Sequence, residues 1–236
     1  RLSTIVETIR TLSAYVEEDP DSFRDRVRSS VNDGEDLDAV LRSVVDEYDP
    51  STRKRNIAFL DLETNGSNPN RDEIIEVGIT IRNARNEVVA EYQELFSPTP
   101  DSLRTRGVDF QEVHGISEEM LEGKTTFRDD KEAQARILSL LQGCSMSAHN
   151  QGFEERHLNM DLPGFHEMKI PVIDTMVVAR HLDDSKGASL QAFSENNGIA
   201  YEEAHRGLKD SQMSADAFFN WQDRLVAKNK SMADSQ

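Results

Sequence analysis

The first 50 residues place apolar side chains at the spacing of helix faces and contain no strand-like run. Apolar residues recur every three or four positions, which predicts three short amphipathic helices. The second begins after Asp19-Pro20, Asn32-Asp33-Gly34 separates it from the third, and Asp49-Pro50 ends the region. The apolar faces comprise Leu2, Ile5, Val6, Ile9, Leu12 and Val16 in the first helix, Phe23, Val27 and Val31 in the second, and Leu37, Val40, Leu41, Val44 and Val45 in the third.

Beyond residue 55 the pattern changes to strands. Three runs are apolar and β-prone, at 56–63, 74–81 and 88–96, and residues 83–87 form a hairpin-like connection between the last two. Helical patterns then dominate, interrupted by one short buried strand at 145–148. The predicted helices span 131–141, 151–160, 175–182, 190–196 and 208–226.

Strands followed by helices that alternate with a single strand indicate the α/β class, with a mixed sheet flanked by helices. We expect a small N-terminal helical region at 1–50, a polar, basic linker at 51–55 and the α/β domain at 56–227. Residues 228–236 are expected to form a frayed tail.

Composition narrows the class of protein. At 236 residues and 36% hydrophobic content, the chain can hold one α/β domain and a small accessory region. No stretch approaches the roughly 18 consecutive apolar residues of a membrane span, so no membrane partner is expected. Cys144 is the single cysteine, which excludes a disulfide framework and a thiolate zinc cluster. We expect Cys144 to be a small buried residue and the protein to be cytoplasmic.

The charge balance restricts how the protein would bind nucleic acid. There are 27 basic and 44 acidic residues, for a net charge of −17, which argues against broad affinity for a phosphate backbone. Any nucleic acid must therefore be bound locally. Divalent cations at a cluster of carboxylates, or a partner protein, would supply the missing positive charge.

Two acids stand two residues apart at the end of the first predicted strand, in the segment FLDLET at 59–64. The alternation of a strand sends Asp61 and Glu63 to the same face. Carboxylates about 4 Å apart repel by roughly 4 kcal/mol at an effective dielectric near 20, so such a cluster favours protonation or a bound cation. Oxygen ligands suit Mg²⁺ or Mn²⁺. Alone, the pair is also typical of an ordinary acidic strand end before a turn.

Two further segments bring candidate groups to helix starts. The sequence AHNQGFE at 148–154 follows the short strand, with Asn150 as the expected N-cap and Glu154 in the first turn, although an ordinary capped helix has the same pattern. The sequence HRGLKD at 205–210 precedes a long amphipathic helix. There Asp210 would complete a metal site, and His205, which titrates near neutral pH, would deprotonate the attacking water. A lone loop histidine is otherwise most often simply solvated.

In this order and spacing, the three segments resemble the motifs of the DEDDh exonucleases, which include the proofreading epsilon subunit of bacterial replicases, ribonuclease T and oligoribonuclease. Supporting matches are VHGI at 113–116, DTM at 174–176 and GI at 198–199, and the resemblance spans about 56–224. One departure stands out. The second motif usually ends in Asp, whereas Glu154 keeps the charge and moves the carboxylate farther from the backbone, with adjacent Glu155 turned about 100° away on the helix.

The resemblance implies a ribonuclease H-like sheet with the site at its strand ends. It implies a 3′→5′ exonuclease that releases nucleoside 5′-monophosphates with two Mg²⁺ or Mn²⁺ ions. Asp61 would bridge both ions, with Glu63 and Asp210 on the first and Glu154 near the second. His205 would act as general base.

The resemblance also suggests residues that contact the substrate, which would be a single-stranded DNA or RNA 3′ end, with DNA favoured. Thr64 and Asn150 are expected to hold the terminal nucleotide. His114 would lie near the 3′ end, or equally would pack its own loop. Asp174 is expected to cap the helix that follows it.

Two other functions stay open from the sequence. One is a weakly active or inactive module of this fold that binds nucleic acid or serves as a replisome scaffold, for which Glu154 is the only hint. The other is an unrelated acidic cation-binding protein. The N-terminal helices could bind a partner protein, pack on the core or self-associate. Their arginines at 24, 26 and 28 stand among acids, which favours a solvated, salt-bridged surface over a phosphate contact.

Overall fold

The computed structural model describes residues 2–12, 20–45, 55–109, 111–183, 186–201 and 206–234. Five strands form one sheet in the order β3-β2-β1-β4-β5. Strand β2 is antiparallel to β1 and β3, whereas β4 runs parallel to β1 and to β5, so the sheet is mixed as predicted. The strands are β1 (Ile57–Thr64), β2 (Ile74–Arg82), β3 (Val88–Leu95), β4 (Ser145–Ala148) and β5 (Val172–Asp174).

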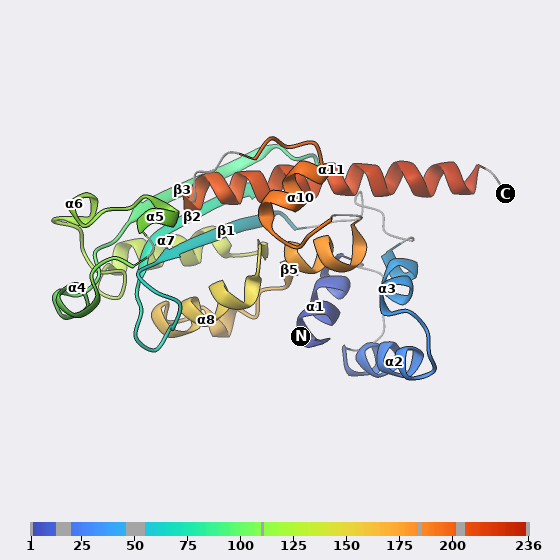
Figure 1. The fold of residues 1–236 in the computed structure, drawn as a ribbon, viewed down its shortest axis with the longest axis horizontal. Coiled ribbons are helices and arrows are strands. Elements are labelled where there is room, and N and C mark those ends of the chain that lie inside the picture. Colours follow the sequence, from blue (N-terminus) through green and yellow to red (C-terminus); the bar gives the residue numbers. More distant parts are fainter. Residues whose placement is uncertain are drawn as a thin grey trace.

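Helices cover both faces of this sheet (Figure 1). The longest helix, α11 (Gly207–Ala233), packs along β1 and β2 and runs on past the end of the sheet. On the opposite face lie α7 (Lys131–Leu141) and α8 (Gln151–Asp161). The shorter helical elements are α4 (Pro100–Arg106), α5 (Gln111–His114), α6 (Glu118–Leu121), the 3₁₀ turn η2 (His166–Met168), α9 (Thr175–Val177), the π-helical turn η3 (Val178–Leu182) and α10 (Leu190–Asn196).

Strand β1 separates two hydrophobic cores because its side chains alternate between the faces. Ile57 and Phe59 point into the core shared with α11, where the Phe59 ring lies 5.7 Å from that of Phe218. Leu60 and Leu62 point into the core shared with α7 and α8. Continuing this alternation, Asp61 and Glu63 emerge on the α11 side, so the hydrophobic pattern of β1 sets the direction of its acids.

The N-terminal helices α1 (Leu2–Leu12), α2 (Pro20–Asn32) and α3 (Leu37–Val45) share the first of these cores. Helix α1 packs against the edge strand β5, and Ile9 joins the same buried cluster as Ile173 and Trp221. A hydrogen bond ties the two regions, because the backbone N–H of Asp174 donates to the Thr8 hydroxyl at 3.0 Å. The N-terminal helices therefore complete the packing around β5.

The predicted apolar positions of these helices whose side chains are described are buried, except Leu37, which is partly buried, and Val31. Val31 is 39% exposed, since it lies near the end of α2, which packs mainly against α1 and α3 and ends beside the turn at Asp33-Gly34. Val16 lies outside the described residues, and the side chains of Leu2, Phe23, Val44 and Val45 are not described. The linker expected at 51–55 also lies outside them, except for Arg55.

The expectation of a frayed tail from residue 228 is wrong for most of that segment. Helix α11 continues to Ala233, seven residues beyond the predicted end. Residues 227–233 contain no Gly or Pro to stop a helix, and Lys230 in the last turn interacts favourably with the helix dipole.

Among the described helices, none combines the length and the apolar character that crossing a bilayer requires.

Candidate active site

Three carboxylates meet where β1 passes under the start of α11. One oxygen from each of Asp61, Glu63 and Asp210 lies within 4.8 Å of the other two. Asp61 and Glu63 come from the same face of β1, and Asp210 comes from the first turn of α11. The structure therefore brings together three of the residues singled out in the sequence.

Two glycines allow α11 to begin so close to the sheet. A Cβ atom on Gly78 of β2 would lie 1.9 Å from the backbone carbonyl carbon of Gly207. A Cβ on Gly207 would in turn lie 2.9 Å from the backbone nitrogen of Gly78 and 3.0 Å from the Asp61 carbonyl oxygen. Backbone therefore packs directly on backbone here, which places the first helical turn against β1.

Burial and mutual repulsion set the electrostatics of this site. Burial, followed by the charges of Asp210 and Glu76, holds the pKa of Asp61 well above its usual range. Burial and then Asp61 and Asp210 raise the pKa of Glu63 to about 10. Such a cluster cannot be fully ionised near neutral pH without a compensating positive charge.

Glu154 is the fourth acid, and it lies outside the group of three. It occupies the first turn of α8, is buried, and has a pKa raised first by burial and then by Asp61. Its charge also contributes to the raised pKa of Glu63. Its Oε2 atom is buried and finds no hydrogen-bond donor among the residues described. Adjacent Glu155 is exposed and accepts a hydrogen bond from Gln151, in keeping with its expected orientation away from the site.

Asn150 stands at the N-cap position of α8, but its side chain does not accept the capping hydrogen bond that we predicted. Its backbone is left-handed, with φ of 78°, a conformation that Asn tolerates better than most residues. In this conformation the Asn150 backbone N–H donates to the Asp174 carboxylate on β5 at 3.1 Å. The same carboxylate accepts the Met176 N–H at 2.8 Å, so the expectation that Asp174 caps the following helix is confirmed.

The side chains of Thr64 and His114 form hydrogen bonds within their own loops. The Thr64 hydroxyl donates to the Gly66 carbonyl at 2.5 Å within the turn after β1. His114 is buried, and its Nδ1 accepts the Ile116 N–H at 3.0 Å while its Nε2 lies 2.9 Å from the Asp109 carbonyl oxygen. These contacts match the loop-packing alternative for His114. His205 lies outside the described residues.

A further carboxylate beside the cluster, Glu76 of β2, was missed in the sequence. It lies directly opposite Glu63 in the β1–β2 register and is fully buried. Arg206, the residue before α11, forms an ion pair with it at 2.8 Å. The available signal was Glu76 itself, the one charged residue in the otherwise largely apolar run at 74–81. A buried charge requires a hydrogen-bonding or oppositely charged partner.

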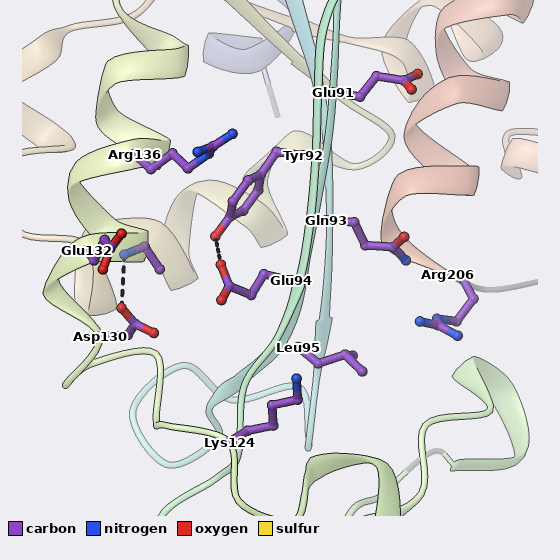
Figure 2. Close-up of a pocket in the computed structure, with 11 residues that line it drawn as sticks. Glu91, Tyr92, Gln93, Glu94, Leu95, Lys124, Asp130, Glu132, Arg136 and Arg206 are labelled. Atoms are coloured by element: carbon purple, nitrogen blue, oxygen red, sulfur yellow. Dashed lines mark hydrogen bonds between the residues drawn. The ribbon is translucent and has the colours of Figure 1, made fainter.

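Arg206 also borders a surface hollow of about 800 Å³ along the edge strand β3 (Figure 2). Tyr92 and Glu94 point to the α7 side of the strand, where the Arg136 guanidinium lies 5.8 Å from the Tyr92 ring centre. Glu91 and Gln93 point to the α11 side, and Gln93 lies near Arg206. None of the four acids singled out in the sequence lines this hollow, so the candidate site is the carboxylate cluster beneath α11.

A mixed sheet of this order with carboxylates at the end of its central strand defines a ribonuclease H-like nuclease fold. The chain belongs to the RNase_T family, described as Exonuclease, whose model matches residues 58–218. The predicted resemblance to the DEDDh exonucleases is therefore confirmed, as is the predicted fold.

Individual relatives agree with this family. The PolC-type DNA polymerase III of Thermotoga petrophila is 31% identical over 188 residues, which are 79% of this chain but 13% of that protein. Two solved structures share the fold. Exonuclease I of E. coli in complex with a dT13 oligonucleotide has a TM-score of 0.58 at 18% identity, covering 74% of this chain and 43% of that one. The nuclease domain of 3'hExo, a DEDDh family member bound to rAMP, has a TM-score of 0.55 at 19% identity, covering 73% and 94%.

Proposed function

We propose that this chain is a 3′→5′ exonuclease domain that hydrolyses the terminal phosphodiester of nucleic acid and releases nucleoside 5′-monophosphates. The observation that carries the proposal is the meeting of Asp61, Glu63 and Asp210 within 4.8 Å in a site that holds a raised pKa on each β1 acid. Family membership supplies the reaction class.

The donor set fits divalent cations. All the candidate ligands are carboxylate oxygens, the chemistry that Mg²⁺ and Mn²⁺ prefer. The buried Oε2 of Glu154, which has no donor among the described residues, is the kind of atom that a cation would satisfy. We propose that Asp61, Glu63, Asp210 and Glu154 hold two such ions. When bound, the ions supply positive charge to the attacking and leaving oxygens of the phosphodiester.

The remaining roles follow from the residues of the chain itself. His205 accepts the proton of the attacking water, since neutral imidazole is a base near neutral pH. Thr64 holds the terminal nucleotide through its backbone, because its hydroxyl is already engaged with Gly66. Asn150 holds it through its side-chain amide, since its backbone N–H is donated to Asp174. His114 shapes the loop beside the 3′ end, with both ring nitrogens directed to backbone groups.

The substrate in this proposal is a single-stranded 3′ end, with DNA favoured over RNA. Support comes from similarity to a DNA polymerase III and to an exonuclease bound to a dT13 oligonucleotide. The net charge of −17 agrees with local binding through cations. A protein partner of the N-terminal helices would meet polar faces such as the one where Asp25 pairs with Arg24 and Arg28, since their apolar sides are buried.

Shortening of a 5′-labelled single-stranded oligonucleotide tests the proposal. With Mg²⁺ or Mn²⁺, we expect loss of one nucleotide at a time, no reaction in EDTA and no reaction when the 3′ end carries a blocking group. DNA and RNA of one sequence, compared by kcat/KM, test the preference. His205→Ala should abolish cleavage, whereas His166→Ala, at an exposed position on η2, should not. An unreactive wild type with either metal would instead favour a non-catalytic module.

A further inference from the structure

Glu76 is a buried charge whose two oxygens are both satisfied. Oε1 accepts hydrogen bonds from Arg206 Nη2 at 2.8 Å and from Gln93 Nε2 at 2.7 Å. Oε2 accepts the backbone N–H of Gly207 at 2.9 Å and lies 3.2 Å from Arg206 Nε. The donors come from Gln93 of β3, from Arg206 just before α11 and from Gly207, the first residue of α11, so this carboxylate joins the edge of the sheet to that helix.

This satisfied state distinguishes Glu76 from the acids around it. A carboxylate with donors on both oxygens has little capacity left for a cation, whereas the Oε2 atom of Glu154 has no donor among the residues described. Glu76 lies opposite Glu63 in the strand register, one step from the cluster. It is therefore placed behind the site and not within it.

Arg206 and Gly207 are the residues that Glu76 holds, and they determine where α11 begins. The Arg206 carbonyl accepts the first helical hydrogen bond from the Asp210 N–H, at 2.9 Å. Gly207 rests against Gly78 with no room for a Cβ atom. Fixing residues 206 and 207 thus restrains Asp210, which lies in the first turn of the helix.

We propose that Glu76 and Arg206 are positioning residues, whose ion pair fixes the start of α11 so that Asp210 is held at the carboxylate cluster. The inference rests on the proposed nuclease function for its catalytic consequence. Its structural part, the docking of the first turn of α11, stands on the contacts alone. Groups that orient metal ligands in this way typically change activity or metal affinity by about 10- to 100-fold when substituted.

Three substitutions test the pair in the full chain. Arg206→Lys keeps the charge but loses the planar fork that reaches Glu76 through Nε and Nη2. Glu76→Gln keeps the shape and removes the charge. Gln93→Ala removes one donor from an exposed position and is the mildest of the three. The matched control is Arg85→Lys, because Arg85 forms an exposed ion pair with Glu87 at 3.0 Å in the β2–β3 hairpin.

Two readouts separate positioning from general stabilisation. We expect kcat to fall about 10- to 100-fold in Arg206→Lys and Glu76→Gln, with KM within about threefold. Hydrogen exchange of a peptide covering 206–212 should become faster while peptides from β1 and α7 stay protected. Gln93→Ala should show the same pattern more weakly, and Arg85→Lys should match wild type.

The outcomes are decisive for each claim. Unchanged kcat and unchanged exchange at 206–212 in Arg206→Lys and Gln93→Ala would overturn the inference, and so would exchange that rises equally in every peptide. If Glu76→Gln fails to fold, the other two variants still decide. If the wild type cleaves no oligonucleotide, the proposed function fails, and the exchange data still test whether the pair holds α11.

Discussion

Glu63 and Glu76 face each other across β1 and β2, yet their surroundings are opposite. Glu76 is met by Arg206, by the Gly207 N–H and by Gln93. Glu63 is met by other carboxylates, which together with burial raise its pKa to about 10. The same residue type therefore has two different roles. Glu76, whose oxygens accept hydrogen bonds, stabilises the contact between the sheet and α11. Glu63, which lies among other carboxylates, favours the binding of a cation.

Removing an acid from the cluster should have the largest effect on activity. Asp61→Asn should lower kcat/KM by at least about 10³-fold, more than the roughly 10- to 100-fold typical of groups behind a ligand. In EDTA the variant should be as stable as wild type or more stable, because repulsion with Glu63 and Asp210 is relieved. Oligonucleotide cleavage and thermal unfolding measure the two effects.

Glu155→Gln, which alters an exposed neighbour of Glu154, is the matched control and should leave both quantities unchanged. An Asp61→Asn protein that cleaves normally would remove the cluster from the reaction. One that unfolds at much lower temperature in EDTA would show that Asp61 has a structural role like that of Glu76.

The cluster should also make the metal-free protein less stable as pH rises. The folded-state pKa of Glu63, about 10, exceeds its unfolded value of 4.5, so the folded state binds more protons between these pH values. The contribution is therefore complete below about pH 4.5 and is lost as pH rises toward 10, by at most about 1.4 kcal/mol per pH unit for one group. Urea unfolding in EDTA at pH 6 and pH 9 measures the slope.

Glu63→Gln should flatten that slope, and saturating Mn²⁺ should raise the stability of the wild type at pH 8 more than that of the variant. An identical slope in the wild type and Glu63→Gln would contradict the electrostatic description of this site.

The smallest effect is expected at His157 of α8, a buried polar group outside the cluster. Both ring nitrogens are buried without a hydrogen-bond partner among the described residues, and the ring lies 4.7 Å from that of Phe153. Burial lowers its pKa to about 4 from 6.5, so its contribution is complete above pH 6.5 and lost as pH falls toward 4. His157→Phe should stabilise the protein by about 1 kcal/mol at pH 7.5 and by more at pH 5.

Thermal unfolding at the two pH values gives both differences, and His166→Phe on the exposed turn η2 serves as control. A destabilised His157→Phe protein would indicate that the imidazole has a partner that matters for folding.

Periodicity predicted most of the fold because the longer elements have strong patterns. The runs at 57–64 and 74–82 and helix α7 were recognised almost to the residue. Strand β5 and helices α4 to α6 are three to seven residues long, too short to show a period. The last turns of α11 were missed because residues 227–233 are mostly polar and show no apolar face, which is the pattern expected of a disordered tail.

The candidate site divides in the same way. Asp61 and Glu63 were predictable because a strand sends alternate residues to one face. The left-handed backbone of Asn150 was not predictable, since its N–H bonds to Asp174, 24 residues away. Nor was the role of Glu76, whose partner Arg206 lies 130 positions along the chain. Local sequence patterns predict the face to which a side chain points, whereas the residues that it contacts depend on the tertiary structure.

The contact between α1 and β5 has a consequence for biosynthesis. Thr8 and Asp174 are 166 positions apart, so a ribosome translating about 5–20 residues per second needs roughly 8–30 s to make the strand that α1 covers. Throughout that interval the apolar residues Ile5, Ile9 and Leu12 of α1 cannot pack against β5. The nascent chain thus exposes these apolar side chains early, and their burial against β5 is a late step of folding.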